Sequence, residues 1–125
     1  MAKIEKFEDL IAWQKARILL KEVYQATRGT KFSKDFKFAG QIQSASLSVM
    51  SNIAEGFDRG LRAEFHQFLS MAKGSCGEVR SQLYAASDIG YIDEQQFQSL
   101  RELSEEVSKI INGLRSSIEG WDATS

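Results

Sequence analysis

The sequence predicts an all-α fold, an antiparallel up-down-up-down four-helix bundle, from three observations. In four long segments, apolar residues recur at steps of three and four, which is the spacing of a helix that buries one stripe. The 125 residues include no proline, the residue least compatible with helix interiors. Short connections separate the segments, and short links between long helices favour antiparallel neighbours. A chain of this length forms a single domain, 1–125, around one core.

The first two helices are predicted over residues 8–27 and 35–55. Glu8 and Asp9 suit the positive end of the first helix dipole, and Gly29 is placed to end that helix. The first helix is expected to bury one apolar face, formed by Leu10, Trp13, Ala16, Leu20, Val23 and Tyr24. The inner face predicted for the second helix consists of Phe38, Ile42, Ala45, Val49 and Ile53.

The third and fourth helices are predicted over residues 62–87 and 93–119. Gly56 and Gly60 bracket the corner before the third helix, and Gly90 supplies a left-handed stop after it. The core stripe predicted for the third helix consists of Phe65, Phe68, Leu69, Ala72, Cys76, Val79, Leu83 and Ala86. The fourth helix is expected to bury Phe97, Leu100, Leu103, Val107, Ile110, Ile111, Leu114 and Ile118.

Residue counts exclude several classes of site. Cys76 is the single cysteine, so an intrachain disulfide is excluded and a reducing compartment is indicated. Because it lies on a core stripe, it is predicted to be a small buried residue rather than a reactive thiol. His66 is the single histidine and has no Glu three residues before it. A di-iron bundle site and a Cys/His zinc site are therefore excluded.

The sequence also indicates which partners the protein lacks. No apolar run reaches the ~18 residues of a membrane span, and the charged N-terminal segment has no secretory core. P-loop and GxGxxG motifs are absent. We therefore predict a cytoplasmic protein that is not an enzyme and has no cofactor, no metal, no membrane partner and no small-molecule substrate.

Two strips of basic residues are candidates for binding nucleic acid. Residues 1–80 carry thirteen Lys and Arg against nine Asp and Glu, whereas residues 81–125 carry three against eight, which gives the net charge of −1. A basic strip can follow a phosphate backbone, and an aromatic ring can stack on an exposed base. The alternative is a solvated flank, because charged residues border every buried helix stripe. The candidates are Arg17 and Lys21 on the first helix and Arg62, Lys73, Arg80 and Tyr84 on the third.

Two further groups are candidates for contacts between subunits. Ile11 and Ile18 lie opposite the apolar face of the first helix, where another subunit could cover them, although single exposed apolar residues are also common. Two glycines inside the third helix cost about 1 kcal/mol each relative to alanine, a cost that the close approach of another subunit could offset. A tolerated, exposed weak spot is the alternative. This small-residue strip consists of Ser70, Gly74, Gly77 and Ser81.

The predicted corner and third helix carry a specific residue pattern. The pattern comprises Asn52-Ile53-Ala54-Glu55-Gly56-Phe57, Arg59-Gly60, Glu64-Phe65, Phe68-Leu69-Ser70 and Ala72-Lys73-Gly74-Ser75, with Phe7-Glu8-Asp9-Leu10 and Trp13-Gln14-Lys15-Ala16 before it and Gly90-Tyr91-Ile92 after it. Over residues 4–118, the chain resembles the bacterial four-helix-bundle proteins encoded in intervening sequences of large-subunit ribosomal RNA genes. It departs from that pattern near Met50, where those proteins usually have proline, and at Leu61, where they have serine or a similar cap.

The resemblance implies a four-helix bundle that assembles as a ring, typically a homopentamer, with no known enzymatic activity. It also implies kinship with the accessory variability proteins of diversity-generating retroelements, which are basic rings that bind a reverse transcriptase and its RNA. The leading hypothesis is a non-enzymatic, ring-forming scaffold for RNA or a ribonucleoprotein. The alternative is a protein-interaction adaptor, for example of a reverse transcriptase, with no direct contact to nucleic acid.

Overall fold

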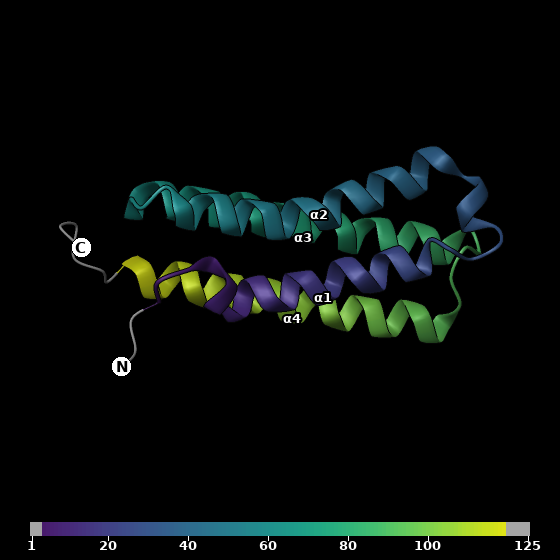
Figure 1. The fold of residues 1–125 in the computed structure, drawn as a ribbon. Coiled ribbons are helices and arrows are strands. Elements are labelled where there is room, and N and C mark those ends of the chain that lie inside the picture. Colours follow the sequence, from purple (N-terminus) through teal and green to yellow (C-terminus); the bar gives the residue numbers. More distant parts are fainter. Residues whose placement is uncertain (1–3, 120–125) are drawn as a thin grey trace.

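The computed structural model describes residues 4–119 of the chain, and four long helices dominate them (Figure 1). No strand occurs among these residues, which confirms the predicted all-α, four-helix fold. The elements in chain order are the 3-10 helix η1 (Phe7–Asp9), α1 (Ile11–Ala26), the 3-10 helix η2 (Phe32–Lys34), α2 (Phe36–Asp58), α3 (Arg62–Asp88) and α4 (Glu94–Glu119).

Each helix packs mainly against two others. α2 contacts α1 and α3, and α4 contacts α3 and α1. In Figure 1, α1 runs from left to right, α2 returns to the left, α3 runs to the right and α4 returns, so consecutive helices point in opposite directions. α1 and α3 therefore occupy diagonally opposite corners of the bundle, as do α2 and α4. This placement decides which surface residues can act together.

α3 supplies the stripe that its sequence predicts. Each fully buried large apolar side chain contributes about 1.5–3 kcal/mol relative to an exposed one, so this stripe is a major part of the core. Phe68, which was included in the predicted stripe, is only half-buried at the edge toward α2. The buried members of the stripe are Phe65, Leu69, Ala72, Cys76, Val79, Leu83 and Ala86.

The buried face of α1 differs from the prediction. Leu20 is only half-buried and Tyr24 is exposed, because α1 turns a narrower stripe toward the core. The alanines in this stripe have no bulk and allow α2 and α4 to approach α1 from both sides. The predicted Trp13 lies at the edge of the core and packs against Phe7. The buried residues of α1 are Ala12, Ala16, Leu19, Val23 and Ala26.

Both ends of α1 also differ from the prediction. The helix begins at Ile11 rather than at residue 8, because Leu10 has an extended backbone with φ −76° and ψ 125°. It ends at Ala26, and the Thr27 hydroxyl donates to the Tyr24 carbonyl oxygen at 2.8 Å. Gly29 does not adopt the left-handed conformation of a helix-ending glycine. Among the described residues, positive φ angles occur at the predicted glycines Gly60 (78°) and Gly90 (81°).

α2 continues to Asp58 instead of ending at residue 55, so Gly56 lies inside a helix and not at the corner. Gly56 is buried where α2 crosses α3. A Cβ atom added to it would lie 2.5 Å from Phe68 Cβ, closer than real contacts of this kind. Gly56 is therefore needed for close helix packing, and the corner itself is only three residues long. At its end, Leu61 provides no side-chain cap for α3.

Most of the remaining predicted core of α2 and α4 is buried. Phe38 of α2 and three apolar residues of α4, Leu103, Ile110 and Leu114, are only half-buried against that core. Small residues adjoin them in the buried stripes, Ala39 in α2 and Ser104 in α4. The predicted residues that are buried in these helices are Ile42, Ala45, Val49, Ile53, Phe97, Leu100, Val107, Ile111 and Ile118.

Candidate nucleic-acid interface

The basic residues predicted on α3 lie along its junction with α4. Lys73 Nζ donates to Asn112 Oδ1 at 3.3 Å, and Arg62 Nη1 donates to the Glu119 carbonyl oxygen at 3.2 Å. Arg80 follows Lys73 by seven residues, which returns it to the same flank of the helix, and it is half-buried. These three predicted residues therefore share one face of the bundle.

α4 adds Arg101 and Arg115 to this face, and neither was among the residues predicted to bind nucleic acid. Arg115 Nη1 donates to Asn112 Oδ1 at 3.2 Å, the same oxygen that accepts from Lys73. Within residues 4–119, neither Lys73 nor Arg115 forms an ion pair, and the Arg115 Nε atom is buried without a hydrogen-bond partner. Two cations thus meet at one neutral oxygen. We name the whole set the α3/α4 basic strip; it consists of Arg62, His66, Lys73, Arg80, Arg101 and Arg115.

Two carboxylates accompany the strip. Glu119 Oε1 lies 3.0 Å from His66 Nε2, and Glu105 Oε1 accepts from Arg101 Nη1 at 2.9 Å. Both acids lie toward the ends of the strip and leave its centre, around Asn112, without an ion-paired carboxylate among the described residues. Lys73 and Arg115 at the centre therefore keep uncompensated positive charge, and among the described residues Arg62 and Arg80 also form no ion pair.

Tyr84 lies at one end of the strip. Its ring packs edge-on against Phe97 of α4 with 4.9 Å between the ring centroids, and its side chain remains 50% exposed. The Arg101 guanidinium lies 6.0 Å from the centroid of the same Phe97 ring. An exposed aromatic ring fixed beside a cation is a suitable surface for stacking an unpaired base.

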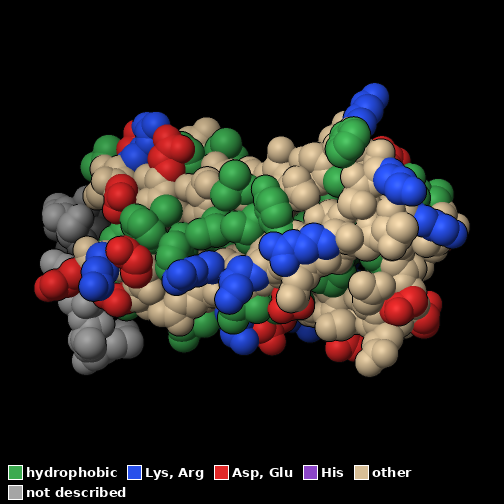
Figure 2. Space-filling view, turned by 45° about the vertical axis from the view of Figure 1, so that its right-hand side comes forward, with side chains coloured by type: hydrophobic (Ala, Val, Ile, Leu, Met, Phe, Trp, Pro, Cys, Tyr) green, Lys and Arg blue, Asp and Glu red, His purple; other side chains and the backbone are tan. Residues whose placement is uncertain are grey.

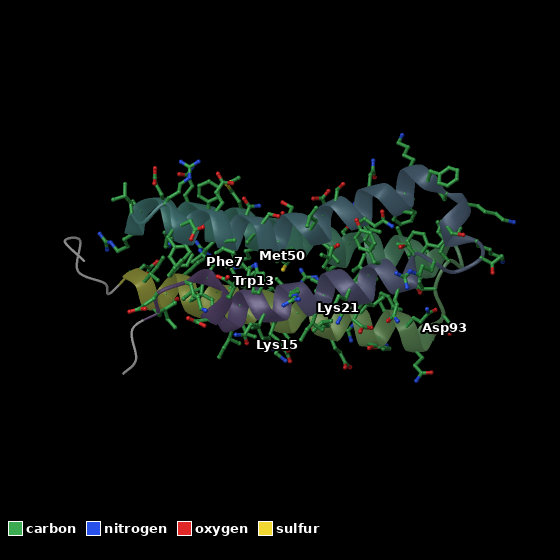
Figure 3. All side chains as sticks on the ribbon, in the orientation of Figure 1. Phe7, Trp13, Lys15, Lys21, Met50 and Asp93 are labelled. Carbon is green, nitrogen blue, oxygen red and sulfur yellow. The ribbon has the colours of Figure 1, made fainter. Side chains whose placement is uncertain are left out.

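Arg17 and Lys21 do not join this strip. They lie on α1, which is diagonal to α3, so no single face of the bundle contains both groups. Arg17 lies over the Trp13 ring, 5.6 Å from its centroid, and Trp13 packs edge-on against Phe7. Figure 3 shows Phe7, Trp13 and Met50 together between α1 and α2. The six predicted nucleic-acid residues thus divide between two separate surfaces of the chain.

The residues predicted to contact another subunit are accessible in the single chain. Ile11 is 62% and Ile18 43% exposed. On the outer side of α3, a Cβ atom added to Gly74 or Gly77 would have no described atom within 4 Å. Ser70 and Ser81 are exposed on the same helix. Coverage of these groups by a neighbouring copy stays a prediction.

The small-residue strip can be tested by substituting alanine for both Gly74 and Gly77. Because the chain itself leaves open space at both positions, we expect the free energy of unfolding to rise by about 1 kcal/mol per substitution, from improved helix propensity. Thermal unfolding followed by circular dichroism measures this change. A lower stability or a smaller assembly would instead indicate that another copy packs closely against the glycines.

The described residues hold no group of three or more His, Cys, Asp or Glu side chains that could bind a metal ion. No described helix is both long enough and apolar enough to span a bilayer. Cys76 is buried, and burial raises the pKa of its thiol to about 12, although the charge of Arg80 acts to lower it.

Comparison with known proteins gives one family and a similar fold. A family described as the 23S rRNA-intervening sequence proteins matches residues 8–113. A solved structure of a protein of unknown function, from the S23 ribosomal protein family of Bacteroides thetaiotaomicron VPI-5482, has a TM-score of 0.76. The match is 22% identical in sequence and covers 84% of this chain and 98% of that one. No curated protein matches the chain.

Proposed function

Because the chain belongs to the family of 23S rRNA-intervening sequence proteins, we propose that it is a non-enzymatic scaffold that binds RNA, or a ribonucleoprotein, along the α3/α4 basic strip. The scaffold is a ring of identical chains, with five copies as the expected number. RNA phosphates contact Arg62, Lys73 and Arg80 of α3, and Tyr84 stacks on an unpaired base.

The observation that supports this proposal is the meeting of Lys73 and Arg115 at Asn112 Oδ1. Two cations at one neutral oxygen repel each other, and an anion between them removes that repulsion. A phosphate supplies such an anion, with oxygens that accept from both an ammonium and a guanidinium group. The surrounding strip then contacts neighbouring phosphates. Several copies in one ring would raise the affinity through effective concentration, even though each strip is short.

The test replaces both central cations with glutamate, as Lys73→Glu and Arg115→Glu together. We expect the affinity for a fluorescein-labelled 30-nucleotide RNA with one hairpin to fall at least about tenfold. The negative slope of log affinity against log salt concentration should become shallower by about 2, because two phosphate contacts are lost. Fluorescence anisotropy at several salt concentrations measures both quantities.

The matched control carries the same change of charge elsewhere, with Lys31→Glu and Lys34→Glu in the exposed connection before α2. If the control loses as much affinity as the strip variant, net charge alone governs binding and the strip is a solvated flank. If neither variant affects binding, the proposed RNA surface is wrong. Circular dichroism of each variant establishes that the bundle remains folded.

The alternative function is a protein-interaction adaptor, for example of a reverse transcriptase, without direct contact to nucleic acid. The apolar surface around Trp13 and Met50, between α1 and α2, favours this function because it offers area that a protein partner could cover. Copurification of a partner protein that survives nuclease treatment would support the adaptor. Loss of the partner after that treatment would instead indicate that RNA connects the two proteins.

A further inference from the structure

An apolar surface with a basic border lies where α1 and α2 meet. Figure 2 shows hydrophobic side chains across the middle of the molecule, with Lys and Arg side chains beside them. On α2, Leu47 is 46% exposed, and Met50 is packed only partly against the core. The residues that α1 contributes lie three or four positions apart between Trp13 and Tyr24, so they share one side of the helix. We name this surface the α1/α2 face; it consists of Phe7, Trp13, Arg17, Leu20, Lys21, Tyr24, Leu47 and Met50.

The charged residues of the α1/α2 face are Arg17 and Lys21. Neither forms an ion pair in the part of the chain that the structure describes. Arg17 lies over the Trp13 ring, so its positive charge is held at the edge of the apolar area. An apolar area with cations of this kind is complementary to an apolar surface that carries unpaired carboxylates.

The other side of α1 offers such a surface. Ile11, Lys15, Ile18 and Glu22 recur at steps of four, three and four, so they form one stripe. Lys15 Nζ pairs with Glu106 Oε1 of α4 at 3.0 Å, which places this stripe beside α4. Glu22 and the exposed Glu102 of α4 form no ion pair within residues 4–119. We name this surface the α1/α4 face; it consists of Ile11, Lys15, Ile18, Glu22, Glu102, Glu106 and Lys109, and its three acids still outnumber its two bases.

We propose that the α1/α2 face of one copy binds the α1/α4 face of a second copy. Ile11 and Ile18 cover the apolar area, and Glu22 faces the unpaired cations of the neighbour. A contact between two α1/α2 faces is disfavoured, because it would place Arg17 and Lys21 opposite the same cations of the other copy. The contact is therefore heterologous, with a different surface on each side.

The two faces adjoin the same helix, and this fixes the kind of assembly. Adjacent faces of a four-helix bundle point about 90° apart, so each copy is rotated by a similar angle relative to the last. Such a contact closes into a ring of about four copies, and a rotation of about 72° would give five. A contact between diagonally opposite corners would instead extend a line of copies, because the two surfaces point in opposite directions. The Ile11 side of α1 and the small-residue strip of α3 are such a pair. The inference rests on the proposed ring and names its contact surfaces.

The experiment measures the mass of the full-length chain in solution at about 10 µM by light scattering. We expect the wild-type chain to form a multimer. Leu47→Lys, on the α1/α2 face, and Ile18→Lys, on the α1/α4 face, should each reduce it to the 14.1 kDa chain. The control is Leu61→Lys, because Leu61 is 61% exposed but lies at the corner before α3, outside both faces. This variant should retain the wild-type mass.

A mixture of the two monomeric variants tests whether the contact is heterologous. The Ile18→Lys chain keeps an intact α1/α2 face, and the Leu47→Lys chain keeps an intact α1/α4 face. The mixture should therefore form one-to-one dimers, and not rings. If the mixture stays monomeric, or if both variants keep the wild-type mass, the proposed faces are wrong while the ring itself stands. A wild-type chain that is monomeric would overturn the ring as well.

Discussion

Replacing Gly56 with alanine is expected to destabilise the bundle by about 2 kcal/mol or more. The new Cβ atom would lie 2.5 Å from Phe68 Cβ and 3.2 Å from Phe65 Cδ1. Phe68 Cβ is fixed to the backbone of α3, so a change of rotamer cannot move it away and the two helices must separate. That separation outweighs the gain of about 1 kcal/mol that alanine brings inside a helix. Urea denaturation at one protein concentration measures the change.

The control for this prediction is Gly40→Ala in the same helix. A Cβ atom at Gly40 would have no described atom within 4 Å, so the substitution should raise stability through helix propensity alone. The two variants are therefore expected to change stability in opposite directions. Equal stabilisation by both would mean that α2 and α3 lie farther apart at Gly56 than the structure places them.

Cys76 is expected to react with an aromatic disulfide reagent at pH 8 at least about a thousandfold more slowly than an exposed cysteine. Burial raises the pKa of its thiol to about 12, and the thiolate is the reactive form. At this pH about one exposed thiol in four is ionised, because its pKa is about 8.5, compared with about one in ten thousand at a pKa of 12. The same shift should make the fold less stable as pH rises from about 9 towards 12, because the unfolded thiol ionises first.

The comparison is a double variant, Ser51→Cys with Cys76→Ala, whose one cysteine lies on the exposed side of α2. Absorbance of the released thiolate gives both rates. In a denaturant that unfolds the chain, the two cysteines should react at similar rates. Fast labelling of native Cys76 would show that α3 opens readily at its centre, which its full burial among apolar side chains argues against.

The helical spacing of apolar residues predicted the fold and every buried residue of α3, because α3 is packed between two helices along one continuous face. Phe68 was the one member of the predicted stripe that is only half-buried. The spacing was only partly right for the first helix, where Leu10, Ala16 and Val23 are buried as predicted but two apolar stripes occur side by side. Leu19 and Leu20 are neighbours of equal size, and their apolar character alone does not decide which of them faces the core; Leu19 is buried and Leu20 only half-buried. Gly56 was placed at a turn because nothing in the chain near it reveals the approach of Phe68 from the next helix.

The candidate interface was predictable only in part. The basic flank of α3 follows from its seven-residue steps, since Lys73 and Arg80 lie seven residues apart in one continuous helix. Arg115 was missed because it lies in a segment with a surplus of acids, and its meeting with Lys73 depends on the pairing of α3 with α4. The separation of Arg17 from that face likewise follows from the order of the helices around the bundle, which the sequence of one chain does not specify.

The diagonal placement of α1 and α3 has a consequence for any assembly in which both contact faces adjoin α1. The corner shared by the two contacts must point to the symmetry axis, so α1 would form the hub of the ring and α3 its outer rim. Each copy would then present its basic strip outward at a regular angular interval. A long polyanion could wind around the circumference of such a ring, instead of passing through its centre.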